Sequence, residues 1–335
     1  MGESSLDVVG IGNAIVDVIA HAEEKDLVAL ELTKGAMTLI DAARAEFLYE
    51  NMGSAVEISG GSAANTMVGL SRLGGAAGYI GKVRNDQLGG IFHHDISTAR
   101  VEFPTRPAIA GPPTARCLIF VTPDAQRTME TYLGASVGLG PDDLDHGLIR
   151  RAKVTYLEGY LWDETPAQEA FVLASKIAHE AGNKVALTLS DPFCVERHRR
   201  SFQDLVEAHV DILFANEIEI LSLYQSKTFD QALQRIRGRC EVAALTRSEK
   251  GSVIVAGEEV HVIDAEPVDA VVDTTGAGDL FAAGFLFGLA RNHDLAACGR
   301  IGSICAAEII SHFGARPETP LDELIHARMG SGVRD

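Results

Sequence analysis

Short apolar, β-forming runs alternate with amphipathic helical stretches along most of this chain of 335 residues. In the stretch 164–181 (ETPAQEAFVLASKIAHEA), apolar and small residues recur at helical spacing and share one face. This alternation predicts an α/β fold, in which a mostly parallel sheet carries helices on both sides. The near-continuous apolar character of the runs agrees with strands that are buried on both faces. The runs are 7–12, 76–83, 154–160, 184–191, 210–216, 241–246 and 252–257.

Two regions break this alternation, one near the N-terminus and the other at 114–133 (TARCLIFVTPDAQRTMETYL). The second has the pattern of two strands around the turn PDAQ, with no helix after each strand. We expect a small sheet, formed by about 13–40 and 104–133, that covers the strand ends of the main layer as a lid. An ordinary surface hairpin is the alternative. Because no linker or repeat is evident, 1–335 are expected to form a single unit, with the remainder as the main α/β domain.

The charge balance narrows the classes of partner. A formal net charge of −18 argues against nucleic acid and anionic membrane surfaces, which are themselves negative. The 5 cysteines include no Cys-x-x-Cys pair and have no histidine at zinc-finger spacing, so neither a disulfide framework nor structural zinc is predicted. The sequence has no signal-peptide pattern and no apolar stretch of membrane-spanning length. We therefore expect a cytoplasmic protein that acts on small molecules.

A glycine-rich stretch directly precedes an apolar helix in VVDTTGAGDLFAAGFLFGLARN (271–292). The apolar residues recur at three- and four-residue steps, so the helix is expected to begin at or just before Asp279. A helix start has unpaired backbone N–H groups and carries about half a positive charge. Gly276, Ala277 and Gly278 would therefore form an anion pocket that suits phosphate. The alternative is that Asp279 is only a first-turn acid that interacts with the helix dipole.

Two long segments, ISGGSAANTMVGLSRLGG (58–75) and DTTGAGDLFAAGF (273–285), together resemble the two signatures of the ribokinase-like carbohydrate kinases, also called the phosphofructokinase-B family. Their order and separation fit the family. Shorter matches, such as NEIE (216–219) and TRSEKGS (246–252), extend the resemblance over nearly the whole chain. The resemblance implies an ATP-dependent kinase with a ribokinase-like three-layer sandwich, a central mostly parallel sheet and a small β-sheet lid.

Within that family, LTLSDPFCVERH (187–198) and VDILFANEIE (210–219) resemble adenosine kinases. This implies transfer of the γ-phosphoryl group of ATP to the 5′-hydroxyl of a purine ribonucleoside, with adenosine as the expected acceptor. Two alternatives remain open. One is a sugar kinase of the same fold that acts on ribose or fructose, and the other is a non-catalytic nucleoside-binding protein. Either a monomer or a homodimer is compatible with the resemblance.

The resemblance also gives the anion pocket a catalytic role. Asp279 would be the general base that takes the proton of the acceptor hydroxyl, and the N–H groups of Gly276, Ala277 and Gly278 would hold the transferred phosphoryl group. The chemistry agrees, because an acid beside an anion pocket brings proton acceptor and charge stabiliser close together. Arg127, in the second lid hairpin, would swing over the phosphates when the lid closes. A solvated surface arginine is the alternative.

The acceptor site is implied at the first lid strand and at the glycine pair. Asp17 would bind the ribose diol, with Asn13 four residues before it. Gly60 and Gly61 would let the sugar approach the backbone closely, and Asn65 would add hydrogen-bonding groups. The alternative is a turn glycine pair followed by an asparagine near a helix start.

Two further residues are implied at the base of the nucleoside. Tyr160 and Leu161 fall where nucleoside kinases flank the purine, and a stacking ring is chemically reasonable there. For Leu161, an ordinary core position is the alternative.

On the nucleotide side, Asn216 and Glu219 match the family's Asn-x-x-Glu motif, which organises Mg²⁺ near the phosphates. The same spacing is that of a helix capping box, and both roles can hold at once. Thr246, Gly251 and Thr275 are assigned to the ATP site. K⁺ is a further candidate ion, because some members of the family bind a potassium-like ion through backbone carbonyls near the anion loop. No residue is assigned to it.

Overall fold

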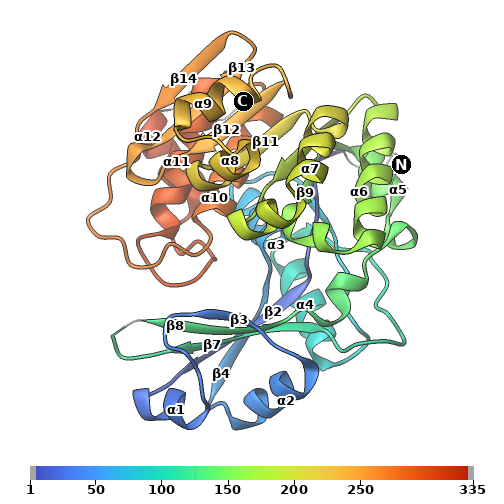
Figure 1. Ribbon diagram of the computed structural model, residues 1–335, viewed down its shortest axis with the longest axis vertical. Coiled ribbons are helices and arrows are strands. Elements are labelled where there is room, and N and C mark those ends of the chain that lie inside the picture. Colours follow the sequence, from blue (N-terminus) through green and yellow to red (C-terminus); the bar gives the residue numbers. More distant parts are fainter. Residues whose placement is uncertain (1–4, 125, 331–335) are drawn as a thin grey trace.

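The main sheet forms the central layer of the molecule. The computed structural model describes residues 5–124 and 126–330, and within them nine strands form this sheet (Figure 1). In spatial order they are β14 (Glu259–Ile263), β13 (Ser252–Ala256), β12 (Val242–Thr246), β11 (Ile212–Asn216), β10 (Lys184–Thr188), β9 (Ala152–Glu158), β1 (Leu6–Ile11), β5 (Ala77–Ile80) and β6 (Val101–Glu102). From β12 to β6 neighbouring strands pair parallel, whereas β13 pairs antiparallel with both of its neighbours. The expected mostly parallel sheet is confirmed.

Helices cover both faces of the main sheet because successive strand residues point to opposite sides. In β1, Val8 belongs to one buried apolar cluster, whereas Val9 and Ile11 belong to the other. The first cluster includes side chains of α3 (Ser62–Arg72), α4 (Gln87–Thr98), α10 (Ala277–Ala290), α11 (Leu295–Ile309) and α12 (Leu321–Met329). The second includes those of α5 (His146–Arg151), α6 (Thr165–Glu180), α7 (Pro192–His209), α8 (Glu217–Tyr224) and α9 (Phe229–Ile236). The three layers agree with the expected sandwich.

A second, smaller sheet lies apart from the main one and is seen at the bottom of Figure 1. In spatial order it contains β3 (Met37–Leu39), β8 (Arg127–Tyr132), β7 (Ala115–Val121), β2 (Ile15–His21) and β4 (Ala55–Gly60). Buried side chains such as Val16 and Val18 pack with those of α1 (Glu24–Ala29) and α2 (Ala42–Asn51). The alternate residues Ile15, Asp17 and Ile19 line a cavity on the other face.

The composition of the small sheet differs from the expected ranges 13–40 and 104–133. β4 lies outside both ranges, and the second region contributes no named strand before Ala115. β4 pairs antiparallel with β2, so it completes an edge that no local pattern had indicated. The expected turn PDAQ includes residue 125, which lies outside the described residues.

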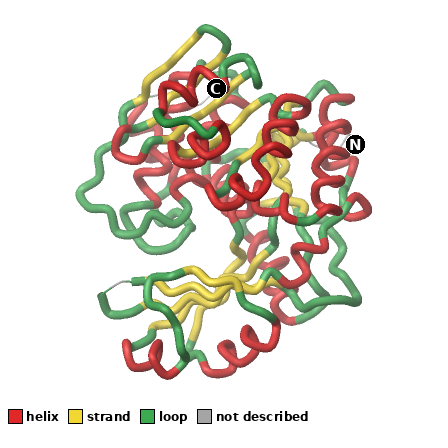
Figure 2. Tube along the Cα trace, viewed as in Figure 1, coloured by secondary structure: helices red, strands yellow, loops and turns green. Residues whose placement is uncertain are grey.

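The carboxyl ends of the parallel strands lie at one edge of the main sheet, where ligands bind in open α/β sheets. Figure 2 shows the small sheet below the main domain. Side chains at three of these ends, Thr188, Asn216 and Thr246, line the same cavity as the small sheet.

Over residues 5–124 and 126–330, none of the helices combines the length and the apolar character needed to cross a membrane. Four short 3₁₀ helices complete the described elements: η1 (Gly134–Gly138), η2 (Pro141–Asp143), η3 (Gly159–Asp163) and η4 (Ser248–Lys250).

Candidate active site

A cavity of about 460 Å³ lies between the small sheet and the carboxyl edge of the main sheet. It brings together most of the site residues predicted from the sequence. Those that line it are Asp17, Gly61, Asn65, Arg127, Tyr160, Asn216, Glu219, Thr246, Thr275, Gly276, Ala277, Gly278 and Asp279. Asn13, Gly60, Leu161 and Gly251 do not line it.

The start of α10 forms an open wall of this cavity. Gly276 is the N-cap residue, with φ of 80°, and as a glycine it has no side chain that could cap the helix. A Cβ atom at Gly276 would lie 3.1 Å from the Cβ of Ala315, whereas a Cβ at Gly278 would meet no atom within 4 Å. The positive φ therefore requires glycine at 276, and the space beside Gly278 is open. Because the first N–H groups of a helix lack partners within the helix, this wall suits an anion.

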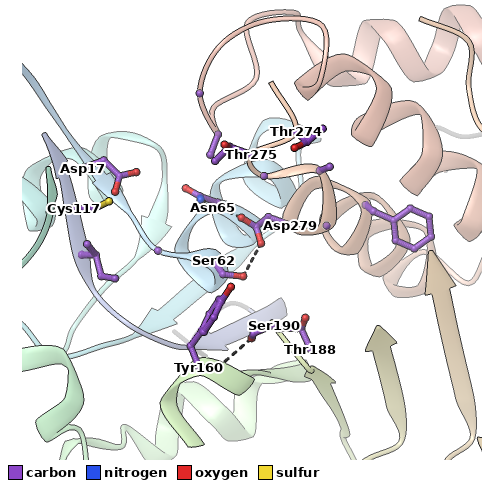
Figure 3. Close-up of a pocket in the computed structure, with 18 of the residues that line it drawn as sticks. Asp17, Ser62, Asn65, Cys117, Tyr160, Thr188, Ser190, Thr274, Thr275 and Asp279 are labelled. Atoms are coloured by element: carbon purple, nitrogen blue, oxygen red, sulfur yellow. Dashed lines mark hydrogen bonds between the residues drawn. The ribbon is translucent and has the colours of Figure 1, made fainter. Parts of the chain in front are cut away.

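Asp279 lies in the first turn of α10 and is held from α3. The hydroxyl of Ser62 donates to Oδ1 at 2.6 Å, and Nδ2 of Asn65 donates to Oδ2 at 3.1 Å (Figure 3). Burial raises the pKa of Asp279 to about 6, against the effect of these two hydrogen bonds and of the charge of Arg316. The carboxylate is therefore fixed in orientation and poised to gain or lose a proton near neutrality.

Asp17 enters the same cavity from β2, on the small-sheet wall (Figure 3). Burial raises its pKa to about 6; Arg316 and Arg127 lower it, and Asp279 raises it. A Cβ at Gly60 would lie 2.4 Å from Oδ2 of Asp17. Gly60 therefore makes room for the Asp17 carboxylate rather than lining the cavity itself, which differs from the predicted contact with substrate.

Asn13 is buried behind the cavity, against an acid that the sequence analysis missed. Its Nδ2 donates to Oε1 of Glu158 at 2.8 Å, and its Oδ1 accepts from the hydroxyl of Ser136 at 2.9 Å. The other oxygen of Glu158 accepts from the N–H of Ala63 at 2.8 Å, in the first turn of α3. Gly61, with φ of 98°, is kept small because a Cβ would lie 2.2 Å from the carbonyl oxygen of Asn13. Asn13 thus holds the chain at the base of the small sheet and does not reach the cavity.

Burial raises the pKa of Glu158 to about 7, although the hydrogen bonds from Ala63 and Asn13 act against this. The residue is 1% exposed and ends β9. An acid at the end of the apolar run VTYLEGY is the signal that could have identified it, because a carboxylate rarely becomes buried without partners.

Arg127 connects the small sheet to the anion loop. Its Nη1 donates to Oδ2 of Asp273 at 2.5 Å and to Oγ1 of Thr275 at 3.1 Å. Both members of the ion pair are almost buried, with side chains 10% and 8% exposed. Burial opposes ionisation of Asp273, but hydrogen bonds from Thr275 and Gly314 and the charge of Arg127 hold its pKa below the ordinary value. Arg127 is therefore not a solvated surface residue, and its guanidinium already lies at the anion loop.

Asn216 and Glu219 form a complete capping box at the start of α8. The N–H of Glu219 donates to Oδ1 of Asn216 at 2.9 Å, and the N–H of Asn216 donates to Oε2 of Glu219 at 2.9 Å. Nδ2 of Asn216 donates to Oε1 of Glu219 at 2.6 Å. Burial raises the pKa of Glu219 to about 7, and the charge of Asp191 acts in the same direction. The capping role that the spacing allowed is therefore present.

The donor set at this wall fits Mg²⁺ only in part. Across residues 5–124 and 126–330, no group of three or more His, Cys, Asp or Glu side chains could enclose a metal ion. Asn216 and Glu219 nevertheless line the cavity, and each carboxylate oxygen of Glu219, which already accepts one hydrogen bond from Asn216, has a further lone pair. Such a pair fits an ion that keeps most of its waters and also binds phosphate.

Tyr160 and Leu161 separate onto different sides of η3. Tyr160 is 39% exposed and lines the cavity, and its ring points toward Ser62 and Asp279 (Figure 3). Its N–H donates to the hydroxyl of Ser190 at 3.2 Å. Leu161 is 1% exposed and belongs to the second apolar cluster, so its prediction as a substrate contact is wrong. A 3₁₀ turn places neighbouring side chains about 120° apart, which explains the separation.

Gly251 also lies away from the cavity. Its φ is 76°, and a Cβ would lie 2.0 Å from the carbonyl oxygen of Ile263. The residue therefore serves the turn between β12 and β13, while Thr246, at the end of β12, lines the cavity.

Comparison with known proteins agrees with this geometry. A model of the pfkB family of carbohydrate kinases matches residues 35–322. The solved structure of a probable sugar kinase from Rhizobium etli CFN 42 is 50% identical, with a TM-score of 0.89 over 97% of this chain and 99% of that one. The adenosine kinase from Sinorhizobium meliloti is also 50% identical, with a TM-score of 0.88 over 97% of this chain and 100% of its own.

A curated relative extends the comparison beyond solved structures. An uncharacterized sugar kinase from Archaeoglobus fulgidus is 30% identical over 260 residues, which cover 76% of this chain and 98% of the relative. The family implies the use of ATP with a divalent metal. The chain therefore belongs to the pfkB family of carbohydrate kinases, and it is a phosphotransferase with an alcohol group as acceptor.

Proposed function

We propose that this kinase transfers the γ-phosphoryl group of ATP to the 5′-hydroxyl of a purine ribonucleoside, with adenosine as the expected acceptor. The observation that carries the proposal is the apolar character of the small-sheet wall. Among its described residues that line the cavity, Asp17 is the only carboxylate. Five residues of this wall are apolar, namely Ile15, Ile19, Ile58, Ile119 and Met129, and the others besides Asp17 are Cys117, Arg127 and Thr131.

This wall suits a molecule with one polar end and one apolar face. A free sugar carries hydroxyls around its ring, and burying a hydroxyl against aliphatic side chains without a partner costs free energy. A nucleoside instead combines a ribose diol, which Asp17 would bind, with a flat base, which the aliphatic wall and Tyr160 would contact. The Sinorhizobium meliloti relative, named an adenosine kinase, supports the same choice.

The side chains at the opposite wall fit the chemistry of transfer. As the acceptor oxygen forms its bond to the γ-phosphorus, Asp279 would take the hydroxyl proton and the bond to ADP would break. The N–H groups at the start of α10 would stabilise charge on the transferred group. Ser62 and Asn65 would keep the carboxylate of Asp279 pointed at the acceptor. Mg²⁺ would supply charge neutralisation at the phosphates when bound, and Asn216 and Glu219 would hold its waters.

ADP production by the purified protein tests the proposal. The acceptors would be adenosine, guanosine, inosine, cytidine, ribose and fructose, each with ATP and Mg²⁺ and with or without K⁺. We expect the highest kcat/KM with a purine nucleoside. Activity confined to ribose or fructose would replace the nucleoside by a sugar, and no ADP with any acceptor would favour a binding protein.

A further inference from the structure

The loop after α11 touches both halves of the active site. Gly314 donates its N–H to Oδ2 of Asp273 at 3.0 Å, and Ala315 lies against Gly276 of the anion loop. The next residue, Arg316, reaches the other way: its Nη2 donates to the carbonyl oxygen and, at 2.8 Å, to the hydroxyl of Ser59. Three successive residues therefore join the phosphate-binding wall to the end of β4.

Ser59 connects Arg316 to α4 through hydrogen bonds. The residue is fully buried, and both its hydroxyl and its N–H donate to Oδ2 of Asp95, at 2.5 and 2.9 Å. Its hydroxyl thus accepts from Arg316 and donates to Asp95. In the part of the chain that the structure describes, Arg316 has no carboxylate at ion-pairing distance, so its charge is not neutralised by direct contact.

The position of Ser59 makes this contact relevant to substrate binding. It immediately precedes Gly60, whose missing side chain makes room for the carboxylate of Asp17. A shift of the β4 end would therefore move the residue against which Asp17 packs. The same loop backs the anion-binding glycine through Ala315, so a single arginine spans the acceptor side and the phosphate side.

We propose that Arg316 is a positioning residue for phosphoryl transfer, which clamps the end of β4 to the loop behind the anion-binding glycines and supplies a fixed positive charge behind Asp17 and Asp279. The inference rests on the proposed roles of these two carboxylates. Both must be ionised at once, one to accept hydrogen bonds from the diol and the other to take a proton. Two acids that face one cavity disfavour each other's ionisation unless a cation compensates.

The charges around the site leave Arg316 as the cation suited to this task. Arg316 lowers the pKa of both Asp17 and Asp279. Arg127 also acts on Asp17, but it is itself paired with Asp273. The remaining ionisable groups that interact with these residues are Asp95, Arg72, Cys117, Glu158, Tyr79, Tyr156 and Tyr160.

Two variants separate the effect of the Arg316 charge from that of its hydrogen bonds to Ser59, and a third variant is the control. Arg316→Gln removes the charge, and Arg316→Lys keeps the charge but loses the planar fork that holds Ser59. The control is Arg72→Gln, which removes an exposed positive charge that also interacts with Arg316 but contributes nothing to the cavity lining. Carbon-13 NMR of aspartate-labelled protein would follow the two carboxylates during a pH titration, with Asp17→Asn and Asp279→Asn used to assign them.

For Arg316→Gln we expect the pKa of both carboxylates to rise by about one pH unit. The pH below which kcat/KM declines should rise by the same amount. For Arg316→Lys the two pKa values should stay near wild type while KM for the acceptor rises several-fold. Arg72→Gln should behave as wild type in both measurements.

The proposal is overturned if Arg316→Gln leaves both pKa values unchanged, or if Arg316→Lys leaves KM for the acceptor unchanged. Should Arg316→Gln fail to fold, the KM of Arg316→Lys decides alone. The NMR titration needs no substrate. A wild-type protein without turnover on any acceptor would therefore contradict the proposed function, while the titration would still test Arg316.

Discussion

Two helix starts face the same cavity, and they differ in how their backbone N–H groups are satisfied. At the start of α8, Asn216 and Glu219 cap the helix and each other through three hydrogen bonds. At the start of α10, Gly276 has no side chain that could cap the helix, and within residues 5–124 and 126–330 the only partner seen for the N–H of Ala277 is the backbone oxygen of Thr274, at 3.2 Å. Both starts contribute positive potential at the cavity, because the N-terminal residues of each helix line it.

This difference determines which of the two helix starts can bind an anion. A capped helix has already satisfied its donors inside the protein, so binding a phosphate there would require breaking the cap. An uncapped start has donors available to a ligand without that cost. We therefore expect the transferred phosphoryl group at α10, and at α8 only the water-mediated contacts that the outer lone pairs of Glu219 allow.

We call the uncapped start of α10 the open start and the capped start of α8 the capped start. The largest effect on turnover should come from changing Asp279, the acid of the open start. Asp279→Asn removes the proton acceptor but keeps the size of the side chain and its place beside Ser62 and Asn65. We expect turnover to fall about 10²- to 10⁴-fold with little change in ATP affinity. Steady-state kinetics and calorimetric binding of ATP would measure both.

A matched control lies in the first turn of the capped start. Glu217→Gln makes the same kind of neutralisation in α8, where the acid pairs with Arg247 and does not line the cavity. Its turnover should stay within a few-fold of wild type. Comparable losses in the two variants would mean that overall charge, and not a base, explains the effect of Asp279.

Filling the open start should separate activity from stability. A Cβ at Gly278 meets no protein atom, and alanine is favoured over glycine in a helix by up to about 1 kcal/mol. Gly278→Ala should therefore raise Tm slightly. We expect kcat to fall by one to two orders of magnitude, because the methyl group would occupy the space of the phosphoryl group.

Gly90→Ala is the control for this variant. Gly90 is an exposed residue of α4 with the same open space around its Cβ position, and it lies outside the cavity lining. It should give the same gain in stability with unchanged turnover. A Gly278→Ala protein with wild-type kcat would place the phosphoryl group elsewhere.

Both helix starts could be predicted because their signals are local. Gly-Ala-Gly before an apolar helix and Asn-x-x-Glu at a strand end each lie within a few residues, where spacing alone fixes the geometry. The alternation of elements predicted a mostly parallel main sheet with helices on both sides, but it did not give the order of the strands.

The missed features depend on contacts between distant parts of the chain. Asn13 meets Glu158 across 145 positions, and Arg316 meets Ser59 across 257. No periodicity relates such residues, so neither contact could be read from the sequence. Leu161 was misplaced for another reason: its apolar character fits both a base contact and the core, and only the turn of η3 decides between them.

The enzyme should lose activity at acid pH because Asp279, at the start of α10, becomes protonated. The pKa of Asp279 is about 6, and Asp17 has a similar value, so the two titrate as a pair. We expect kcat/KM to decline below about pH 6, by about tenfold per pH unit for each proton that must be lost. A flat profile down to pH 5 would contradict the requirement for ionised carboxylates.

The contribution of Asp279 to stability should fall as pH rises, whereas its contribution to activity should increase. A folded-state pKa raised from 3.8 to about 6 means that the contribution of Asp279 to stability is present below pH 3.8 and is lost as pH rises through about 6. Asp279→Asn should therefore equal wild type near pH 4 and exceed it at pH 8 in urea unfolding. Equal stabilities at pH 8 would show that burial does not disfavour this carboxylate.

The smallest effect should come from the capped start. Glu219→Gln keeps a side chain that can complete the capping box, so we expect the unfolding free energy at pH 5 to stay within about 1 kcal/mol of wild type. The pKa of Glu219 is raised from 4.5 to about 7, so its stabilising contribution is lost as pH rises through about 7. The variant should therefore gain stability relative to wild type between pH 5 and pH 8.

The dependence on Mg²⁺ distinguishes a pure cap from a cap that also holds the metal waters. If Glu219 has both roles, Glu219→Gln should need a several-fold higher Mg²⁺ concentration for half-maximal turnover. Thr228→Ala removes a cap of α9 away from the cavity, so it should cost about 1 kcal/mol of stability and leave the Mg²⁺ requirement unchanged. An unchanged requirement in Glu219→Gln as well would reduce this helix start to a structural cap, and the open start of α10 would then be the only one of the two that acts on the phosphates.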